Sequence, residues 1–266
     1  MSKKINANAA GSVGNVLLEE LLGLQRPRVP SLEPLIARIL ASDTAAQGGI
    51  ATCHRCGAAF QGSSSVRTCC ETCSRRRGIP DVLVALGDYT TGLGILLSAA
   101  KYGRWPEVLG PLGRRLGDTL LAEFGHRTHD PPLLVPMPAP WIRKWHRGID
   151  HARELANAVG EVTQWDVLPL LCRRFEATQV GRSRTQRQRG VRGLAPRLFG
   201  ASRMCGRRVF LIDDVRTSGT SLAKASRLCR RLGATEVVAG VVAVRREATK
   251  RGKYSPKSEH SPPRRA

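Results

Sequence analysis

Apolar runs alternate with amphipathic segments along the second half of the chain, from about residue 133 to residue 244. The runs LLVPMP, DVLPLL, RVFLI and EVVAGVVAV predict short buried strands. Between them, GIDHARELANAVG carries Ala152, Leu155 and Val159 at helical spacing, and SLAKASRLCRRLG predicts another helix. Strands that are apolar throughout and separated by helices are typical of a mostly parallel sheet covered on both faces. The pattern therefore predicts an α/β fold.

The pattern changes on either side of this region and predicts four parts. Residues 1–50 form a leader that is partly helical, at VGNVLLEELLGL, or disordered, and RPRVPSLEP reads as a proline-limited linker. Residues 51–76 form a cysteine-rich module, and residues 85–245 form the α/β domain, which opens with two helical pieces broken near Gly103. The polar, basic residues 246–266 are expected to be a disordered tail.

Composition narrows the function more than the fold. The 266 residues include 41% hydrophobic residues, enough for a buried core, but aromatic residues make up only 5%, which argues against broad stacking platforms for nucleic-acid bases. The net charge of +22 attracts polyanions without identifying one, and a generally basic, solvated surface is the alternative. Because the sequence has no apolar run long enough for a membrane span or a secretory signal, we expect a cytoplasmic protein.

Two C-x-x-C pairs predict a metal site in the cysteine-rich module. Cys53 pairs with Cys56, and Cys70 pairs with Cys73, so two turns can each present two thiolates. Four thiolates close a tetrahedron around Zn²⁺ and leave no open position, which predicts a structural zinc ribbon rather than a catalytic centre. A redox pair is the alternative. Cys69 competes with Cys70 as a ligand, but only Cys70 has the two-residue spacing to Cys73.

The stretch VFLIDDVRTSGTSL predicts a ligand site at the carboxyl edge of the sheet. Asp213 and Asp214 end an apolar strand. The loop that follows contains hydroxyl residues and one glycine, which suit an anion: Thr217, Ser218, Gly219, Thr220 and Ser221. A sugar phosphate explains both features, with the carboxylates accepting from sugar hydroxyls and Mg²⁺ offsetting the remaining charge. A simple helix N-cap accounts for only one of these residues.

This stretch resembles the phosphoribosyl diphosphate motif of type I phosphoribosyltransferases. The resemblance implies that Asp213 and Asp214 bind the ribose hydroxyls and that residues 217–221 bind the 5′-phosphate. A cysteine ribbon, KYGR, VPMP, R-x-x-x-R-G and T-Q-V-G precede the acidic pair in that order. Together they resemble the ComF/GntX family, phosphoribosyltransferase-like proteins with an N-terminal zinc ribbon that are associated with DNA uptake in competence. The likeness implies binding of phosphoribosyl diphosphate with Mg²⁺ and favours a transferase.

Several basic residues near the motif are candidates for the diphosphate. Arg143 and Arg147 follow VPMP, whose prolines lack amide donors, and arginine suits phosphate. Solvated helix-face arginines are the alternative, and Lys101 of KYGR is open to the same two interpretations. His146 and His151 have either an acid–base or a structural role. The chain departs from the family pattern at residues 149–151 and at Thr178-Gln179, which suggests a different second substrate or reduced activity.

An arginine-rich segment, VGRSRTQRQRGVRG, admits three interpretations: a loop closing over the diphosphate, a nucleic-acid contact strip, and a charged loop without a partner. The sequence thus leaves two hypotheses. One is a transferase in which Asp213 and Asp214 are catalytic. The other is an accessory protein that binds single-stranded DNA or another nucleic acid and retains a non-catalytic ribose-phosphate site.

Overall fold

The computed structural model describes residues 29–46, 51–60, 69–102, 105–125, 131–139, 149–173 and 193–246. Within these residues, a four-stranded sheet has the order β3-β8-β7-β4 and all of its pairings are parallel. Its strands are β3 (Val82–Asp88), β4 (Leu133–Pro136), β7 (Arg208–Arg216) and β8 (Glu236–Val244). The predicted α/β class with a parallel sheet flanked by helices is confirmed.

Side-chain alternation along the strands divides the core into two layers. Leu134 and Ile212 face one layer, while Val135 and Leu211, their chain neighbours, face the other. The first layer is covered by α2 (Val29–Ala46), α4 (Gly92–Lys101), η1 (Pro106–Val108), α5 (Leu109–Phe124) and α7 (His151–Thr163). The second is covered by α9 (Gly200–Met204) and α10 (Thr220–Arg231). Both faces of the sheet are therefore buried, as its continuous apolar strands require.

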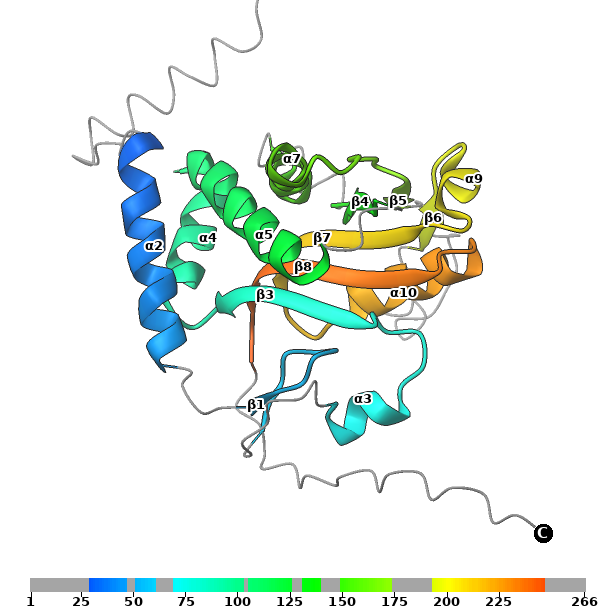
Figure 1. Cartoon of the computed structure of the whole chain (residues 1–266), viewed down its shortest axis with the longest axis horizontal. Helices are drawn as coiled ribbons and strands as arrows, with labels where there is room; N and C mark the ends of the chain where they lie inside the picture. The colour runs from blue at the N-terminus through cyan, green and yellow to red at the C-terminus, as the bar shows by residue number, and fades with distance from the viewer. Residues whose placement is uncertain are drawn as a thin grey trace, which may run out of the picture.

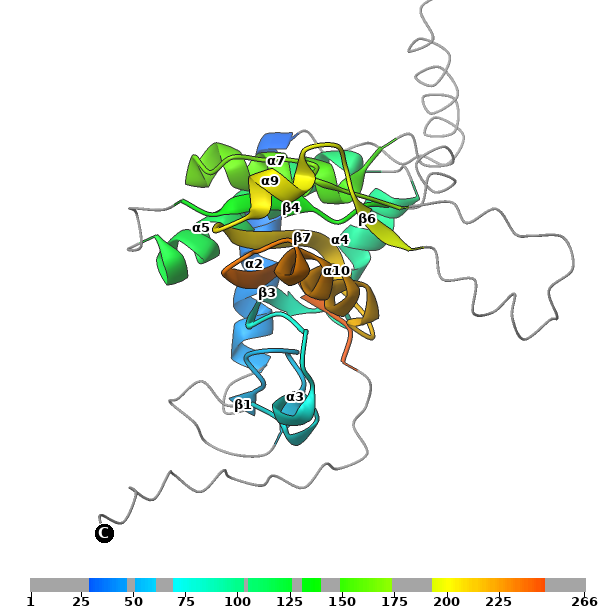
Figure 2. The ribbon, with the colours of Figure 1, turned by 90° about the vertical axis from the view of Figure 1, so that its right-hand side faces the viewer.

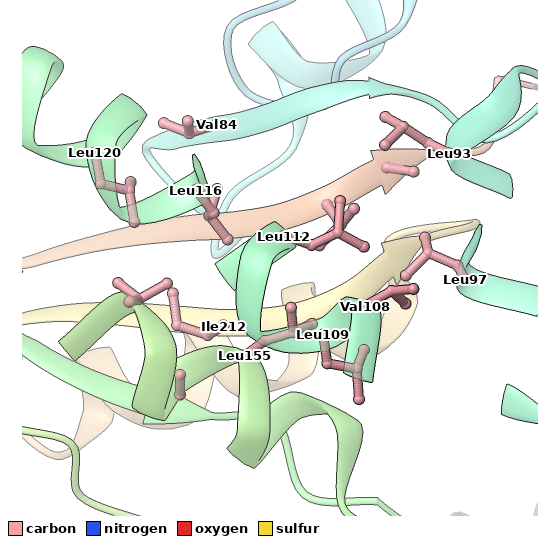
Figure 3. Packing of buried hydrophobic residues seen from close by; sticks show 14 of the residues in the cluster. Val84, Leu93, Leu97, Val108, Leu109, Leu112, Leu116, Leu120, Leu155 and Ile212 are labelled. Carbon is pink, nitrogen blue, oxygen red and sulfur yellow. The ribbon is translucent and has the colours of Figure 1, made fainter. Parts of the chain in front are cut away.

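Leucines of α5 fill the first layer. Leu112, Leu116 and Leu120 are fully buried and lie in one cluster with Val84 and Ile212 of the sheet (Figure 3). On its other side α5 packs against α7. A methyl group added at Gly113 would lie 2.6 Å from Cβ of Ala158, so the missing side chain permits this close approach.

The helix α2 corrects the expected linker at RPRVPSLEP. Residues from Val29 onward are helical, with Pro34 inside the helix. Leu32 and Ile36 lie one turn apart and are 1% and 0% exposed in the core, and Glu33 makes a 3.0 Å ion pair with Arg114 of α5. This burial stabilises the helix despite the proline (Figure 1).

The strands differ from the sequence prediction at two places. The strand β3 was not predicted, and the expected domain start at residue 85 falls inside it. The expected strand DVLPLL does not join the sheet as one: Val167 makes a single bridge to Leu134. The chain then enters β5 (Leu171–Arg173), which pairs with β6 (Leu194–Pro196) in a separate antiparallel pair. Pro169 has no amide hydrogen to donate to a ladder, which explains the interruption.

The cysteine module, defined as residues 51–60 and 69–76, lies beyond β3 at the end of the sheet away from β4 (Figure 2). It contains β1 (Ala51–Thr52), β2 (Ala59–Phe60) and α3 (Glu71–Arg75). Arg55 attaches it to the domain, because Nε donates to the carbonyl of Pro80 at 3.1 Å, and the amide of Leu83 donates to the carbonyl of His54 at 2.7 Å. Among the helices of the described residues, none has the length and apolar character to cross a bilayer.

Candidate functional site

The acidic pair lies at the carboxyl end of the interior strand β7, inside the strand rather than after it. Asp213 is in register with Val241 of β8, and the pairing continues to Arg216. The amide of Asp214 donates to Oδ1 of Asp213 at 3.0 Å. The carboxyl edge of a parallel sheet is where α/β folds bind ligands, so the predicted location is the one observed.

A lysine and a histidine from other elements lie beside the carboxylate of Asp214. Nζ of Lys101, the last residue of α4, lies 3.0 Å from Oδ2. Nδ1 of His151, the first residue of α7, lies 3.8 Å from the same oxygen. Nε2 of His151 is buried and has no hydrogen-bond partner within the described part of the chain. A buried imidazole nitrogen of this kind is available to a ligand or to water.

The two carboxyl groups have opposite protonation tendencies. Burial, followed by the negative charge of Asp214, raises the pKa of Asp213 to about 7. Burial also acts on Asp214, but the interactions with His151 and Lys101 outweigh it and lower its pKa below the usual value. The pair therefore carries less than two full negative charges near neutral pH, and Lys101 compensates for that of Asp214.

A cavity of about 210 Å³ opens beside the pair, and we refer to it as the acid-pair cavity. Its polar lining comprises Lys101, His151, Arg173, Asp213, Asp214, Thr217 and Ser221. Nε of Arg173 donates to the carbonyl of Pro138 at 2.7 Å, which fixes that arginine beside the VPMP turn. Met137 and Pro138 line the same cavity, so the VPMP turn borders the acidic pair.

The hydroxyl loop divides between this cavity and a second one. Thr217 and Ser221 line the acid-pair cavity, whereas Thr217, Ser218 and Gly219 line a neighbouring cavity toward the cysteine module. Gly219 precedes α10 with φ +71°, a conformation that favours glycine, and Oγ of Ser218 donates to Oγ1 of Thr220 at 3.0 Å. Thr220 begins the helix itself and lines neither cavity.

Other predicted site residues cannot be placed. Arg143, Arg147, His146 and residues 174–192, which include Thr178-Gln179 and the arginine-rich segment, lie outside the described residues, as do residues 247–266. Conversely, Arg173 is a residue that the sequence analysis missed, and Lys101 and His151 were left undecided. KYGR was the only local signal for Lys101, and no local pattern marks Arg173.

The four predicted cysteines converge in the cysteine module. Sγ atoms of Cys53, Cys56, Cys70 and Cys73 all lie within 4.8 Å of one another. Sulfurs at Zn–S distances of about 2.3 Å in a tetrahedron are roughly 3.8 Å apart, and Sγ of Cys56 and Sγ of Cys70 are 3.7 Å apart. Hydrogen bonds from Cys56 and Cys73 lower the pKa of the Cys53 thiol. The cluster therefore fits a closed, structural zinc site, and Cys69 is not one of its four residues.

Known proteins resemble the chain over more than half of its length, although no protein-family model matches it. It is 28% identical over 193 residues to Competence protein F of Haemophilus influenzae, covering 70% of this chain and 81% of that protein. It is 31% identical over 160 residues to DNA utilization protein YhgH of Salmonella typhimurium, covering 58% of this chain and 68% of that protein. YhgH of Escherichia coli K12 is 30% identical over 162 residues, with the same coverage of both chains.

Similarity to solved structures is weaker. The allosteric regulatory enzyme of purine biosynthesis aligns with a TM-score of 0.33 and 22% identity, covering 49% of this chain and 25% of that chain. A purine phosphoribosyltransferase from Pyrococcus horikoshii Ot3 aligns with a TM-score of 0.29 and 14% identity, covering 56% of this chain and 94% of that chain.

Proposed function

We propose that this protein binds phosphoribosyl diphosphate in a process linked to DNA uptake. The chain belongs to the ComF family, together with Competence protein F and DNA utilization protein YhgH. The names of the relatives support the link to DNA. The ligand is supported by the motif Asp213-Asp214 followed by residues 217–221, and by the cavity that brings the acids and two loop hydroxyls together.

The observation that carries the proposal is that the acidic pair and two hydroxyls of the loop, Thr217 and Ser221, line one cavity, and the opposite pKa shifts of the two acids agree with it. A ribose hydroxyl both donates and accepts hydrogen bonds. The carboxylate of Asp214 can accept from one ribose hydroxyl, and the neutral carboxyl of Asp213 can donate to a ribose oxygen near neutral pH. A pair in which Asp213 is partly protonated also repels a phosphorylated ligand less than two full carboxylates would.

The phosphate end of the ligand is assigned to the hydroxyl loop. Thr217 and Ser221 present hydroxyl groups to the acid-pair cavity. None of the acceptors in the described part of the chain takes the amide hydrogens of Thr217, Ser218 or Gly219. Free amides before a helix N-terminus suit a 5′-phosphate. Arg143 and Arg147, which follow the VPMP turn in sequence, are proposed to bind the diphosphate.

Magnesium is proposed as the companion of the diphosphate, and a bound ion would supply positive charge to the leaving group. Carboxylates are the oxygen donors that Mg²⁺ prefers, so Asp213 and Asp214 fit it. Lys101 already neutralises Asp214, however, so the acidic pair does not depend on the ion for charge balance. The chain's own cations at the cavity, Lys101 and Arg173, favour a developing diphosphate anion.

A transferase reaction follows if a nitrogen nucleophile reaches the ribose. The nitrogen forms a bond to C1 while the bond from C1 to the diphosphate oxygen breaks, and diphosphate leaves with the electron pair. We assign Asp213 and Asp214 the task of holding the ribose during this step, so catalysis comes mainly from positioning. The cysteine cluster is proposed to hold a structural Zn²⁺ that maintains the module.

An accessory role in binding nucleic acid is the second candidate, favoured by the net charge of +22 and the names of the relatives. In that case the acid-pair cavity binds phosphoribosyl diphosphate without turning it over. Nonspecific binding of single-stranded DNA by general charge attraction weakens as the salt concentration rises. Binding that remains at salt concentrations where nonspecific binding is lost would support this role.

Isothermal titration with phosphoribosyl diphosphate and Mg²⁺ tests the ligand, and diphosphate release with a panel of nitrogen bases tests turnover. We expect binding by the unaltered protein and at least about tenfold weaker binding by Asp214→Asn, because a charged hydrogen-bond acceptor is lost. The exposed residue Arg203 of α9, changed to Ala, serves as a control. Absence of binding by the zinc-loaded full chain would overturn the proposal.

A further inference from the structure

The neighbouring cavity, between the cysteine module and the loop before α10, has a volume of about 330 Å³, and we refer to it as the interdomain cavity. Its wall on the module side is held firmly, because Arg55 donates to the carbonyls of Pro80 at 3.1 Å and Cys73 at 3.0 Å. The opposite wall is formed by Ser218 and Gly219. The hydrogen bond from Arg55 to Pro80 attaches the cysteine module to the α/β domain, so the shape of the cavity is determined by the fold.

The floor of the interdomain cavity is apolar. Ile79, Leu222 and Ala223 line it and are 7%, 3% and 8% exposed, and Ala58 and Leu83 add half-buried apolar surface. An apolar floor favours a flat, weakly polar group such as a nucleobase over a fully hydrated ion. A simple phosphate or sulfate ion would leave this surface unused.

The rim of the interdomain cavity is strongly basic. Five arginines line it: Arg55, Arg76, Arg216, Arg245 and Arg246. None of the described residues that line it is an aspartate or glutamate, although Cys56, Cys70 and Cys73 of the cysteine cluster line it as well. A zinc ion held by four thiolates would bring net negative charge to the module, and five arginines more than balance it. Arginine presents a fork of donors suited to phosphate, so the rim favours a phosphate ester.

Arg216 connects this cavity to the ligand motif. In the sequence Arg216 lies between the acidic pair and the hydroxyl loop. In the structure it lines the interdomain cavity and not the acid-pair cavity. A methyl group added at Gly219 would lie 3.2 Å from Nε of Arg216, so the guanidinium lies against the loop on this side. The loop therefore has two functional faces, with Thr217 lining both cavities.

We propose that the interdomain cavity binds one nucleotide, with its phosphate at Arg76, Arg216 and the Ser218 hydroxyl and its base on the apolar floor. The volume suits a ligand of this size, since small-molecule sites begin at about 300 Å³. The nucleotide is either free or the 5′-phosphorylated end of a single strand. The two sources share the same recognition chemistry. The site adjoins the one proposed for phosphoribosyl diphosphate and shares the loop of residues 217–219 with it, but it does not include the acidic pair.

Two adjacent arginines provide a matched test. Arg76 and Arg77 are both exposed, but only Arg76 lines the interdomain cavity. Isothermal titration of the zinc-loaded full chain with each deoxynucleoside 5′-monophosphate should show binding, and the corresponding nucleosides should bind more weakly. Arg76→Ala should weaken nucleotide binding about tenfold, because a charge-assisted hydrogen bond is lost, while Arg77→Ala should leave it unchanged.

Two further comparisons distinguish a free nucleotide from the end of a strand, and binding in the interdomain cavity from binding in the acid-pair cavity. A tetranucleotide that binds only when 5′-phosphorylated assigns the end of a strand as ligand, whereas binding of mononucleotides alone assigns a free nucleotide. Arg76→Ala should bind phosphoribosyl diphosphate as the unaltered protein does, and Asp214→Asn should bind the nucleotide normally. The proposal is overturned if no monophosphate binds at millimolar concentration, or if Arg76→Ala and Arg77→Ala weaken binding equally.

Discussion

The ammonium group of Lys101 lies 3.0 Å from Oδ2 of Asp214 and joins the last turn of α4 to the end of β7. Both side chains are about one-fifth exposed, so solvent screens the pair only in part. Together with the hydrogen bond from His151, this contact lowers the pKa of Asp214 and favours its ionised form. It also ties the acid-pair cavity to a helix more than one hundred residues earlier in the chain.

Replacing Lys101 by Met should destabilise the protein through Asp214. The carboxylate loses its nearest cation, and we expect the free energy of unfolding at pH 7 to fall by about 2 kcal/mol, less than for a fully buried pair. The loss should shrink at pH 4.5, because the pKa of Asp214 rises and the carboxyl takes up a proton. Urea unfolding at both pH values measures this. Lys101→Arg, which keeps the charge, should retain most of the stability, and an equal loss in both variants would contradict the assignment.

Asp213 should make the unfolding free energy depend on pH. Its pKa is about 7 in the folded protein and near 3.8 when unfolded, so the stabilising contribution of the neutral carboxyl is present below pH 4. The contribution is lost progressively as pH rises from about 4 to about 7, because the unfolded chain releases this proton first. Asp213→Asn removes this titration. The stability of the unaltered protein minus that of Asp213→Asn should therefore fall over this window and level off above it. A constant difference would show that Asp213 titrates normally.

The cysteine cluster predicts which thiols hold zinc. We expect one Zn²⁺ per chain, and loss of that metal in Cys70→Ser or Cys73→Ser, because zinc requires all four thiolates in a closed site. Cys69→Ser should retain the metal, although Cys69 adjoins a ligand in sequence. Metal content by atomic emission, together with thermal unfolding before and after chelation, measures both effects. Zinc retained in Cys70→Ser and lost in Cys69→Ser would show that the ligands are assigned wrongly.

The contact between α5 and α7 should tolerate no side chain at Gly113. An added Cβ would lie 2.6 Å from Cβ of Ala158 and 2.9 Å from the carbonyl oxygen of Leu155. Gly113→Val should therefore destabilise the protein by about 1–3 kcal/mol, as overpacking does. Gly110→Ala in the same helix meets only Nη1 of Arg114, at 3.5 Å, and should cause no loss. Chemical unfolding of the two variants compares them directly. Similar stabilities would mean that the helices can separate without penalty.

The sequence predicted the elements whose signal is local and misjudged those stabilised from a distance. The strands β7 and β8 and the helix α10 follow from apolar runs and helical spacing, and all three are confirmed. The helix α2 was not expected to begin at Val29, because Pro34 is a poor helix former. Burial of Leu32 and Ile36 against other helices outweighs that preference, and no local pattern records it.

The candidate site also contains residues that a local sequence signal indicates and residues that only distant contacts bring there. Asp213, Asp214 and residues 217–221 are separated only by Val215 and Arg216, so one strand, one loop and one helix start bring them together and a local motif is enough to select them. The four cysteines are found for a similar reason, since each C-x-x-C pair forms its own turn. These features depend on backbone geometry within a few residues, which the order of amino acids determines.

Only the tertiary structure decided how the motif is charged and which way its parts face. Lys101, His151 and Arg173 reach the acidic pair from three different elements, and their distances to it depend on how those elements pack. The pKa values of two adjacent aspartates diverge because burial and neighbouring charges differ at each carboxyl group. Arg216 lines a second cavity on the other face of the loop, where the cysteine module forms the opposite side. Electrostatic energy depends on distance in space and on solvent exposure, and neither is a property of the sequence pattern alone.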